Sequence, residues 1–308
     1  GPRSTGDGEA PPSGPLAGVS PRSFWASADI VPPSMPKSPL FGAEHADRYE
    51  RQQLIRDYEQ AYECRLVVMR DVIFERSVPF LEELLWDAER DSPLHLMLDS
   101  PGGDGETAVR LVRSAQERCS ELTVIVPNQA KSAATLLLLG AHSILMGPTS
   151  DLGPVDPQFQ IGEGPLVAAK DIIAAVEAAE VAIAANPDSF PLHAALLADV
   201  SAIMVQQARS AIARSADLVR EALSSCPKRQ KRKVAALVSS LTAPLIEAPN
   251  NHGAVFGADD AIKAGLPVTK LDPHSDHWQT IWRLYARYYV LRRAIYEGRI
   301  ASRSPQAE

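Results

Sequence analysis

The feature that most constrains this chain is the run LHLMLD, residues 94–99, which continues into SPGGDGETA. The run is almost continuously apolar, whereas a strand with one face in water alternates apolar and polar residues. It therefore predicts a parallel strand that helices cover on both faces. The adjacent glycines, Gly102 and Gly103, predict a sharp turn into the helix that follows.

The segments around this run alternate in type. An amphipathic helical pattern occupies residues 77–91, a second helical pattern occupies residues 104–119, and a buried helix is predicted at residues 132–141. Strand-like runs separate and flank them, at residues 64–71, 94–100, 122–127 and 143–147. This alternation predicts an α/β fold built on a parallel sheet.

A second polar break, PNQAKS, separates the strand-like run LTVIV from the apolar segment AATLLLLGAHSILM. Ser132 therefore stands where a strand gives way to a buried helix. Ligands of open α/β sheets bind beyond the carboxyl ends of the strands. Both breaks in the pattern, the glycine pair after the first strand and the PNQAKS segment after the second, are predicted to lie there. Taken singly, the glycine pair is a common turn and Ser132 is a common helix N-cap.

Together, the two breaks have the composition of a site for acyl transfer. Backbone N–H groups at a strand-to-helix turn can bind an oxyanion, and glycine lets a carbonyl approach closely. A serine nucleophile needs the same location, with the next N–H group free. The small residues Ala133 and Ala134, which follow Ser132, leave room for a peptide backbone.

Changes in composition predict the domain organisation. Residues 1–41 are rich in Pro, Gly and Ser and predict a disordered tail, while residues 42–165 carry the α/β core. Residues 166–247 form an Ala-rich helical region, and residues 248–272 complete the core with a helix, a turn and a strand. Residues 273–308 are predicted to be an amphipathic helix, DHWQTIWRLYARYYVLRRAIYEGRI, and a tail.

The composition argues against several classes of function. The formal net charge is −7, whereas a nucleic-acid binder needs an excess of basic side chains on one face. The basic cluster at residues 228–233 is interpreted as a solvated helix start. The three cysteines form no CxxC pair, so no zinc site or disulfide framework is expected.

The sequence also bears on location. No apolar run reaches the roughly 18 residues that a membrane-spanning helix needs. No secretory signal is visible, and the initial Gly1-Pro2, in place of Met, is typical of a protease cleavage scar, which leaves open whether a natural leader was removed. A cytoplasmic location is the default expectation.

Five motifs carry a resemblance to a known family: RYERQQLIRDYE, DSPGGDGETA, KSAATLLLLGAHSILMGP, DLGPVDPQ and NHGAVFGADDAIKAGLPV. The chain resembles the ClpP/crotonase superfamily, and in detail the SDH-type (serine dehydrogenase proteinase) family, relatives of signal peptide peptidase A. The resemblance covers about residues 43–272. It implies an α/β fold with a ClpP/crotonase-like parallel-sheet spiral core, to which the Ala-rich helical region and the C-terminal amphipathic helix are added.

The resemblance implies a soluble serine peptidase that cleaves extended or unfolded peptides. Ser132 would be the nucleophile, and the N–H groups of Gly103 and Ala133, with Gly102, would form the oxyanion hole. The substrate strand would lie along the loop after Gly103 and near residues 151–158. The residues expected to bind the substrate are Asp104, Asp151, Gly153 and Asp156.

The general base stays open. ClpP relatives use a histidine on the strand after the nucleophile helix, but here that strand reads SILMGPTS, with Gly147 or Pro148 near the place of the base. His252 and Lys170 are the main candidates, and the adjacent Lys131 is a third. A lysine base would have to be desolvated.

Two further carboxylates are candidates for orienting a histidine base, namely Asp156 and Asp259. His142, inside the apolar run, is interpreted as a packed core residue instead.

Two other functions remain open at the level of sequence. An inactive relative would serve as a binding or scaffold module, since fold alone does not fix function. A crotonase-type acyl-CoA enzyme would keep the glycine pair without needing Ser132. No cofactor or metal is predicted.

The expected partners are a peptide or protein substrate and further copies of this chain. A homo-oligomer is expected to use residues 170–245 and the aromatic stripe of the C-terminal helix. Because no ATP-binding signature is present, any unfoldase or activating partner would be a separate chain.

Overall fold

A computed structural model describes residues 38–161, 166–247 and 254–299 of the chain. Its centre is a six-stranded sheet in the order β10-β5-β3-β2-β1-β11. Neighbouring strands are parallel, except that β11 pairs antiparallel with β1 at one edge. The strands are β1 (Arg65–Arg70), β2 (Leu94–Asp99), β3 (Leu122–Val126), β5 (Ser143–Met146), β10 (Val268–Lys270) and β11 (Ile295–Gly298).

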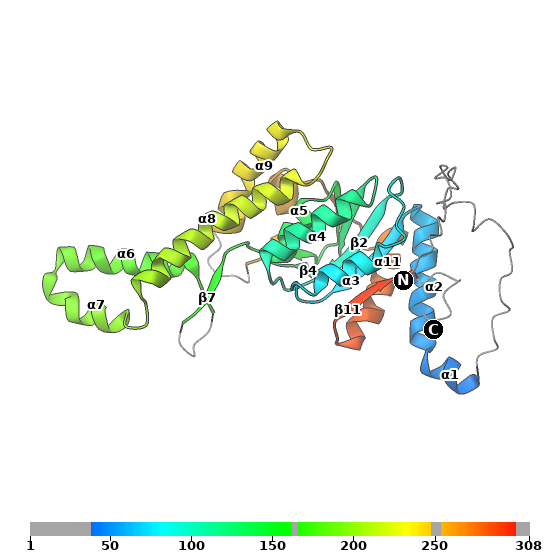
Figure 1. Cartoon of the computed structure of the whole chain (residues 1–308), viewed down its shortest axis with the longest axis horizontal. Coiled ribbons are helices and arrows are strands. Elements are labelled where there is room, and N and C mark those ends of the chain that lie inside the picture. The colour runs from blue at the N-terminus through cyan, green and yellow to red at the C-terminus, as the bar shows by residue number, and fades with distance from the viewer. Residues whose placement is uncertain (1–37, 162–165, 248–253, 300–308) are drawn as a thin grey trace, which may run out of the picture.

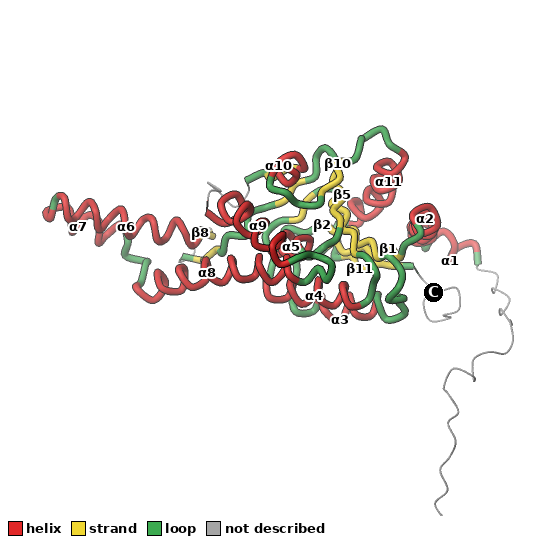
Figure 2. The backbone as a smooth tube through the Cα atoms, turned by 90° about the horizontal axis from the view of Figure 1, so that it is seen from above, coloured by secondary structure: helices red, strands yellow, loops and turns green. Residues whose placement is uncertain are grey.

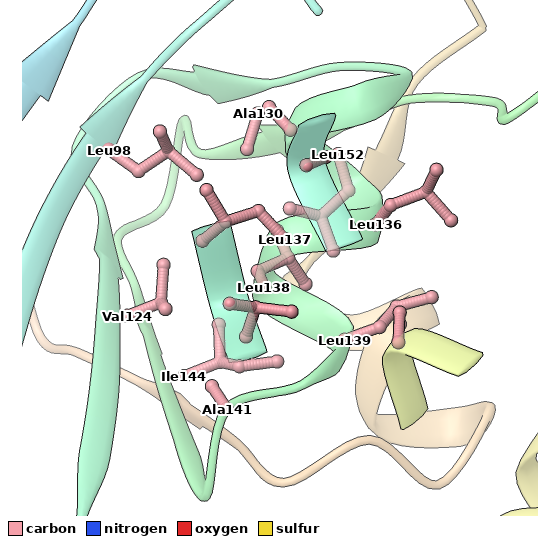
Figure 3. Close-up of a cluster of buried hydrophobic side chains, with 14 of the residues drawn as sticks. Leu98, Val124, Ala130, Leu136, Leu137, Leu138, Leu139, Ala141, Ile144 and Leu152 are labelled. Atoms are coloured by element: carbon pink, nitrogen blue, oxygen red, sulfur yellow. The ribbon is translucent and has the colours of Figure 1, made fainter. Parts of the chain in front are cut away.

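Helices cover both faces of this sheet (Figure 2). On one face lie α3 (Ser77–Leu84), α4 (Gly105–Glu117) and α5 (Ala133–Leu139); on the other lie α2 (Ala46–Tyr62) and α11 (Asp276–Leu291). Successive residues of a strand point to opposite faces, so Val67 of β1 joins the core under α3–α5 while Val68 joins the core under α2 and α11. Figure 3 shows Leu137 and Leu138 of α5 beside the sheet residue Val124.

Two small sheets extend the main one. The first has the order β4-β6-β9, with β4 (Gln129–Ala130), β6 (Asp151–Leu152) and β9 (Phe256–Gly257). The second is an antiparallel pair of β7 (Gln158–Gln160) and β8 (Leu166–Ala168). The predicted fold class, a parallel-sheet ClpP-like α/β core, is confirmed, while the β7–β8 pair was not predicted.

The Ala-rich region forms an arm that projects from the sheet (Figure 1). Its parts are α6 (Ala169–Ala185), the 3-10 turn η2 (Pro187–Ser189), α7 (Phe190–Leu196) and the first part of α8 (Ala202–Ser224). The second part of α8 packs on the core through Leu218, Val219, Ala222 and Leu223. The remaining elements are α1 (Pro39–Glu44), α9 (Lys231–Thr242), the π-helical turn η3 (Ala243–Glu247) and α10 (Ala258–Lys263).

The C-terminal segment differs from the sequence prediction of one continuous helix. Helix α11 ends at Leu291, because Arg292 adopts a left-handed φ of 48°. The chain then pairs with β1, whose edge would otherwise leave its N–H and C=O groups unpaired. The aromatic stripe of α11 is split: Trp278, Tyr285 and Tyr288 are buried in the second core, whereas Trp282 and Tyr289 are exposed.

The basic cluster at residues 228–233 is only partly a solvated helix start. Arg229 turns inward and donates hydrogen bonds to the carbonyls of Leu139 at 2.6 Å, Ala141 at 2.6 Å and Leu223 at 2.9 Å. The last carbonyls of a helix lack intrahelical partners, and a guanidinium with several donors satisfies them. Arg229 thereby ties the ends of α5 and α8 together.

A buried polar chain joins α2, β2 and α11 on the second face. The hydroxyl of Tyr58 lies 2.9 Å from Nδ1 of His95 and 3.1 Å from Nε2 of His277. Burial, with a smaller effect of the nearby His277, lowers the pKa of His95 to about 4. Burial also lowers the pKa of His277. Both imidazoles are therefore neutral in the folded protein near neutral pH.

The hydrogen-bonded side chains of Tyr58, His95 and His277 predict that acid destabilises the fold. A histidine in the unfolded chain has a pKa of about 6.5. Between that pH and about pH 4, the unfolded chain therefore binds a proton at His95, whereas the folded chain does not. Stability is thus full above the unfolded pKa and falls as the pH is lowered. For His95 alone, we expect the free energy of unfolding to fall by about 2 kcal/mol between pH 8 and pH 5.

Urea unfolding at the two pH values measures this loss. His95→Gln should flatten the pH dependence, while His274→Gln, at an exposed position on the loop before α11, should leave it unchanged. An unaltered pH dependence in His95→Gln would contradict the assignment.

Candidate functional site

The segment that follows β2 is held against the segment that follows β3. Ser100 N–H donates to Gln129 O at 3.0 Å, and Lys131 N–H donates to Ser100 O at 3.0 Å. These bonds pair Ser100 with Ala130 in a parallel bridge. The two breaks recognised in the sequence therefore lie side by side at the carboxyl end of the sheet.

Ser132 and Gly102 are in direct contact. A methyl group placed on Gly102 would lie 2.7 Å from Ser132 Cβ and 3.4 Å from Ser132 Oγ. Gly102 itself has a φ of 113°, which other residues rarely adopt. Both conditions require glycine at this position.

The backbone of Ser132 is strained. Its φ of 51° and ψ of −117° form a combination that non-glycine residues avoid. Ser132 occupies the N-cap position of α5, yet its side chain makes no capping hydrogen bond. The capping role that the sequence left open is therefore excluded, and within the described residues the hydroxyl has no hydrogen-bond partner. A strained serine at a strand-to-helix turn matches the geometry of an exposed nucleophile.

Two backbone donors follow Gly102 and Ser132 in the sequence, namely the N–H groups of Gly103 and Ala133. Neither Gly103 N–H nor Ala133 N–H donates a hydrogen bond to any residue in the described ranges. The Gly103 backbone, at a φ of 136°, is clamped on its far side by Ile73. Ile73 N–H donates to Gly102 O and Asp104 N–H donates to Ile73 O, each at 2.8 Å. This clamp was not predicted, because Ile73 lies in a loop after β1 without a sequence signal.

The side chain of Lys131 points into the fold. Its ammonium forms an ion pair with Asp151 and donates to the carbonyls of Leu152 and Ala254, each at 3.2 Å. An ammonium has three N–H donors, and these contacts use all of them. Gly153 makes room for this side chain, because a Cβ there would lie 2.4 Å from Lys131 Cδ.

Thr135 is a second positioning residue, and sequence analysis missed it. Its hydroxyl contacts Ala130 O at 2.7 Å and Gly153 O at 2.9 Å. It is the one polar residue in AATLLLL, a helix that is buried throughout. A hydroxyl in such a helix needs partners, and that requirement is the signal that would have identified it.

The residues expected to bind the substrate occupy different places. Asp104 caps α4, accepting a hydrogen bond from Thr107 N–H at 2.7 Å. Asp151 bonds Lys131 and also accepts from Phe256 N–H at 2.9 Å. Asp156 is buried. Of these three residues, Asp151 holds the neighbour of Ser132 in the sequence, Lys131, and Asp104 stabilises the start of α4.

The candidates for the base are distributed as follows. Lys170 lies half-buried in the first turn of α6, with Nζ 3.5 Å from Glu247 O. His252 lies outside the described residues, between Glu247 and Ala254. Asp259, one of the two proposed orienting carboxylates, forms an ion pair with Lys270 at 2.7 Å, which lowers the pKa of Asp259.

The end of β5 is closed to a histidine of the ClpP type. A Cβ on Gly147 would lie 2.1 Å from the indole ring of Trp278. The indole ring of Trp278, a residue of α11, therefore fills the space that a side chain at residue 147 would need. His142, which the sequence analysis interpreted as a packed core residue, is half-buried: it lies beside Gln116, and Leu122 N–H donates to its Nδ1 at 3.0 Å.

Two general properties of the described residues bear on the site. Within residues 38–161, 166–247 and 254–299, no three His, Cys, Asp or Glu side chains gather closely enough to bind a metal ion. In the same ranges, no helix combines the length and the apolar character that crossing a membrane requires.

Comparison with curated proteins finds two relatives in Methanocaldococcus jannaschii. Uncharacterized protein MJ0137 is 39% identical over 90 residues, and Uncharacterized protein MJ1495 is 36% identical over 75 residues. The stretches cover 29% and 24% of this chain, and 30% and 25% of the relatives. The chain thus spans less than a third of the length of these curated relatives.

Several solved peptidase structures are also similar. The 1510-N membrane-bound stomatin-specific protease is 21% identical, with a TM-score of 0.30, over 35% of this chain and 57% of that one. A peptidase from Plasmodium falciparum is 14% identical, with a TM-score of 0.37, over 68% and 96%. ClpP1 from Listeria monocytogenes is 12% identical, with a TM-score of 0.38, over 71% and 97%.

The family itself is given by a match over residues 53–243, which is more than half of the chain. This range contains the glycine turn, Lys131 and Ser132. The family is described as ClpP-like SDH-type serine proteinase, in agreement with the resemblance seen in the sequence. The chain belongs to the ClpP-like SDH-type serine proteinase family.

Proposed function

We propose that this chain is a serine peptidase that cleaves extended peptides with Ser132 as its nucleophile. The observation that carries the proposal is the contact between Ser132 and Gly102, in which the serine is strained and its hydroxyl caps no helix. A backbone conformation that costs about 1–3 kcal/mol persists only where its surroundings impose it, and such residues cluster at active sites.

The proposed reaction follows from the groups around Ser132. Its hydroxyl attacks the carbonyl carbon of the scissile bond and gives its proton to a base. The oxyanion that develops accepts hydrogen bonds from the N–H groups of Gly103 and Ala133, and Gly102 lets the carbonyl approach. The base returns the proton to the leaving amine, and water then hydrolyses the acyl-enzyme by the same route.

The substrate is proposed to lie as an extended strand past Asp104 and along residues 153–158, near Asp156. Residues Asp151 and Leu152 have neighbours on both sides in the small sheet, so a peptide cannot add as a strand there. Asp151 contributes to the site by holding Lys131. An extended peptide reaches the glycine turn more readily than a folded chain does, which favours unfolded substrates.

The base is proposed to be His252 or Lys170. Lys131 is less suited, because its ammonium is committed to Asp151 and two carbonyls. If His252 is the base, Asp156 is the better candidate to orient it, because Asp156 is buried whereas the exposed Asp259 already pairs with Lys270.

The two alternative functions predict different behaviour. An inactive binding module has no reason to keep a strained serine with an uncommitted hydroxyl, and an acyl-CoA enzyme of the crotonase type does not use that hydroxyl. The state of Ser132 therefore favours the peptidase over both.

We expect a fluorophosphonate probe to label the wild-type protein and to leave Ser132→Ala unlabelled, because only an activated serine reacts. Hydrolysis of an unfolded protein substrate should fall by at least about a thousandfold in Ser132→Ala. Ser224→Ala, at an exposed serine of α8, is the matched control and should behave as wild type. Absence of labelling in the wild type would favour the binding module.

The same assay identifies the base. His252→Gln removes the imidazole, whereas Lys170→Arg keeps the positive charge but cannot accept a proton at neutral pH. Loss of the true base should lower hydrolysis by roughly 10²–10⁴. Full activity in both variants would show that neither residue is the base.

The arm is the proposed contact between copies of this chain. It exposes large apolar side chains, which are Val181, Phe190, Leu192, Leu196 and Ile203. Exposed apolar groups of this size gathered on one projecting element are typical of an interface. The C-terminal helix contributes less than the sequence predicted, because most of its aromatic side chains pack inside the subunit.

We expect light scattering to give a mass that is a multiple of 33.3 kDa. Phe190→Ser combined with Leu196→Ser should lower the mass toward that of one chain, since both side chains lie on α7 and are exposed. Trp86→Ser, which alters an exposed aromatic residue outside the arm, should leave the mass unchanged. A wild-type mass of 33.3 kDa at micromolar concentration would contradict the assembly.

A further inference from the structure

A cavity of about 540 Å³ lies at the carboxyl ends of β1 and β2. Its walls come from the end of β1, the segment after β2, β4, and the turn between α11 and β11. The residues that line it are Arg70, Asp71, Val72, Asp99, Pro101, Gln129, Tyr289, Arg292, Arg293 and Ala294. The function described above uses none of these side chains.

The acidic side chains of the cavity are already engaged. Asp99 is buried and accepts hydrogen bonds from Arg70 at 2.9 Å, Tyr285 at 3.0 Å and Asn128 at 3.2 Å. Asp71 lies 3.6 Å from Arg76 and accepts from its neighbour's backbone N–H. Little acceptor capacity is left to compensate the remaining positive charge.

The arginines have donors to spare. Arg292 and Arg293 are exposed, and no carboxylate in the described part of the chain forms an ion pair with either. Arg70 is held in place by Asp99, by the carbonyl of Arg293 at 3.4 Å, and by the ring of Tyr289, whose centroid lies 5.8 Å from the guanidinium carbon. The cavity is thus locally positive in a chain whose net charge is −7.

The cavity adjoins the proposed active site along three separate segments. Pro101 precedes Gly102, Val72 precedes Ile73, and Gln129 lies three residues before Ser132. A fully extended chain advances at most about 3.6 Å per residue, so Gln129 lies within about 11 Å of Ser132. An extended peptide bound at Ser132 can place a side chain or its end in the cavity within a few residues of the scissile bond.

We propose that this arginine-lined cavity binds a carboxylate group of the peptide substrate. The inference rests on the proposed function, because it concerns the substrate of the same site. Guanidinium groups pair with carboxylates through two parallel hydrogen bonds, and a rigidly held Arg70 gives such a pair a fixed position. The carboxylate comes either from an Asp or Glu side chain or from the C-terminus of the peptide.

Binding is measured with the Ser132→Ala protein, which cannot turn the peptide over. Four fluorescein-labelled peptides of one length are compared by anisotropy: an internal Glu or Gln, each with a free or an amidated C-terminus. We expect the peptides that carry the recognised carboxylate to bind at least about fivefold more tightly than the peptide with none. The preference for Glu or for the free C-terminus identifies the source.

Variants locate the effect. Arg292→Gln combined with Arg293→Gln should remove the preference for a carboxylate, and raised salt should weaken it. Arg283→Gln, which removes an exposed positive charge from α11 outside the cavity, should preserve it. Because Arg283, Arg292 and Arg293 are exposed, these variants should keep the thermal stability of the parent protein.

Equal binding of all four peptides would overturn the proposal. So would an equal loss of preference in Arg283→Gln, since that result would indicate attraction to the overall charge. The failure of this proposal and the failure of the peptidase proposal can be distinguished: carboxylate preference without fluorophosphonate labelling of the wild type would leave the cavity assigned and the peptidase rejected. Labelling of the wild type without a carboxylate preference would support the peptidase proposal and reject the carboxylate site in the cavity.

Discussion

The geometry of this protein depends on the two hydrogen bonds that join Ser100 to Gln129 and Lys131. They pair Ser100 with Ala130 in a parallel bridge. This bridge is shifted by two residues from the register of β2 and β3, in which Met97 pairs with Ile125. Gly102 and Ser132 each lie two residues beyond that pair, and the equal offset brings them together. A side chain at residue 102 would overlap Ser132 Cβ, so the register itself demands glycine there. The contact between the two breaks is a consequence of strand pairing.

Lys131 and Ser132 are adjacent but differ in role: Lys131 fixes the surrounding backbone, and Ser132 is the strained residue that carries the hydroxyl that caps no helix. The ammonium of Lys131 is largely buried and binds Asp151 and Leu152 of β6, together with Ala254 just before β9. One side chain thus fixes all three strands of the small sheet to the start of α5. Removing one partner of such a pair would leave an uncompensated charge, which is strongly destabilising. The strain at Ser132 is sustained by a backbone that the Ser100 pairing and the contacts of Lys131 both fix immediately before Ser132.

The sequence predicts those parts of the fold that depend on local pattern. Apolar strands between amphipathic helices indicate the parallel sheet, and the carboxyl ends of parallel strands meet at one edge, which is why the glycine turn and Ser132 could be placed together. Strand β11 could not be predicted in this way. Its four residues follow α11 after a turn of three residues, 292–294, and only the unpaired edge of β1 makes them a strand.

The inward turn of Arg229 and the clamp formed by Ile73 were hidden for a related reason. In both cases the partner is a backbone carbonyl or N–H group far away in the sequence, and backbone groups carry no sequence signal. The covering of Gly147 by Trp278 is similar, since it depends on the docking of α11. The roles of His252 and Lys170 stay predictions, because a base is defined by its distance from Ser132 and by its protonation.

The C-terminal elements bring a separate source of charge to the site. Tyr285 of α11 bonds Asp99, Asp99 orients Arg70, and the left-handed turn at Arg292 directs the chain back to β1. The charges of Lys131 and Arg70 are balanced by Asp151 and Asp99, so the excess positive charge comes from Arg292 and Arg293. These two arginines lie beyond residue 243, where the family match ends. The proposed nucleophile and its glycine turn therefore depend on one part of the chain, and the charge beside them depends on another. Substitutions in the turn after α11 are expected to alter the proposed carboxylate preference without disturbing the strained serine.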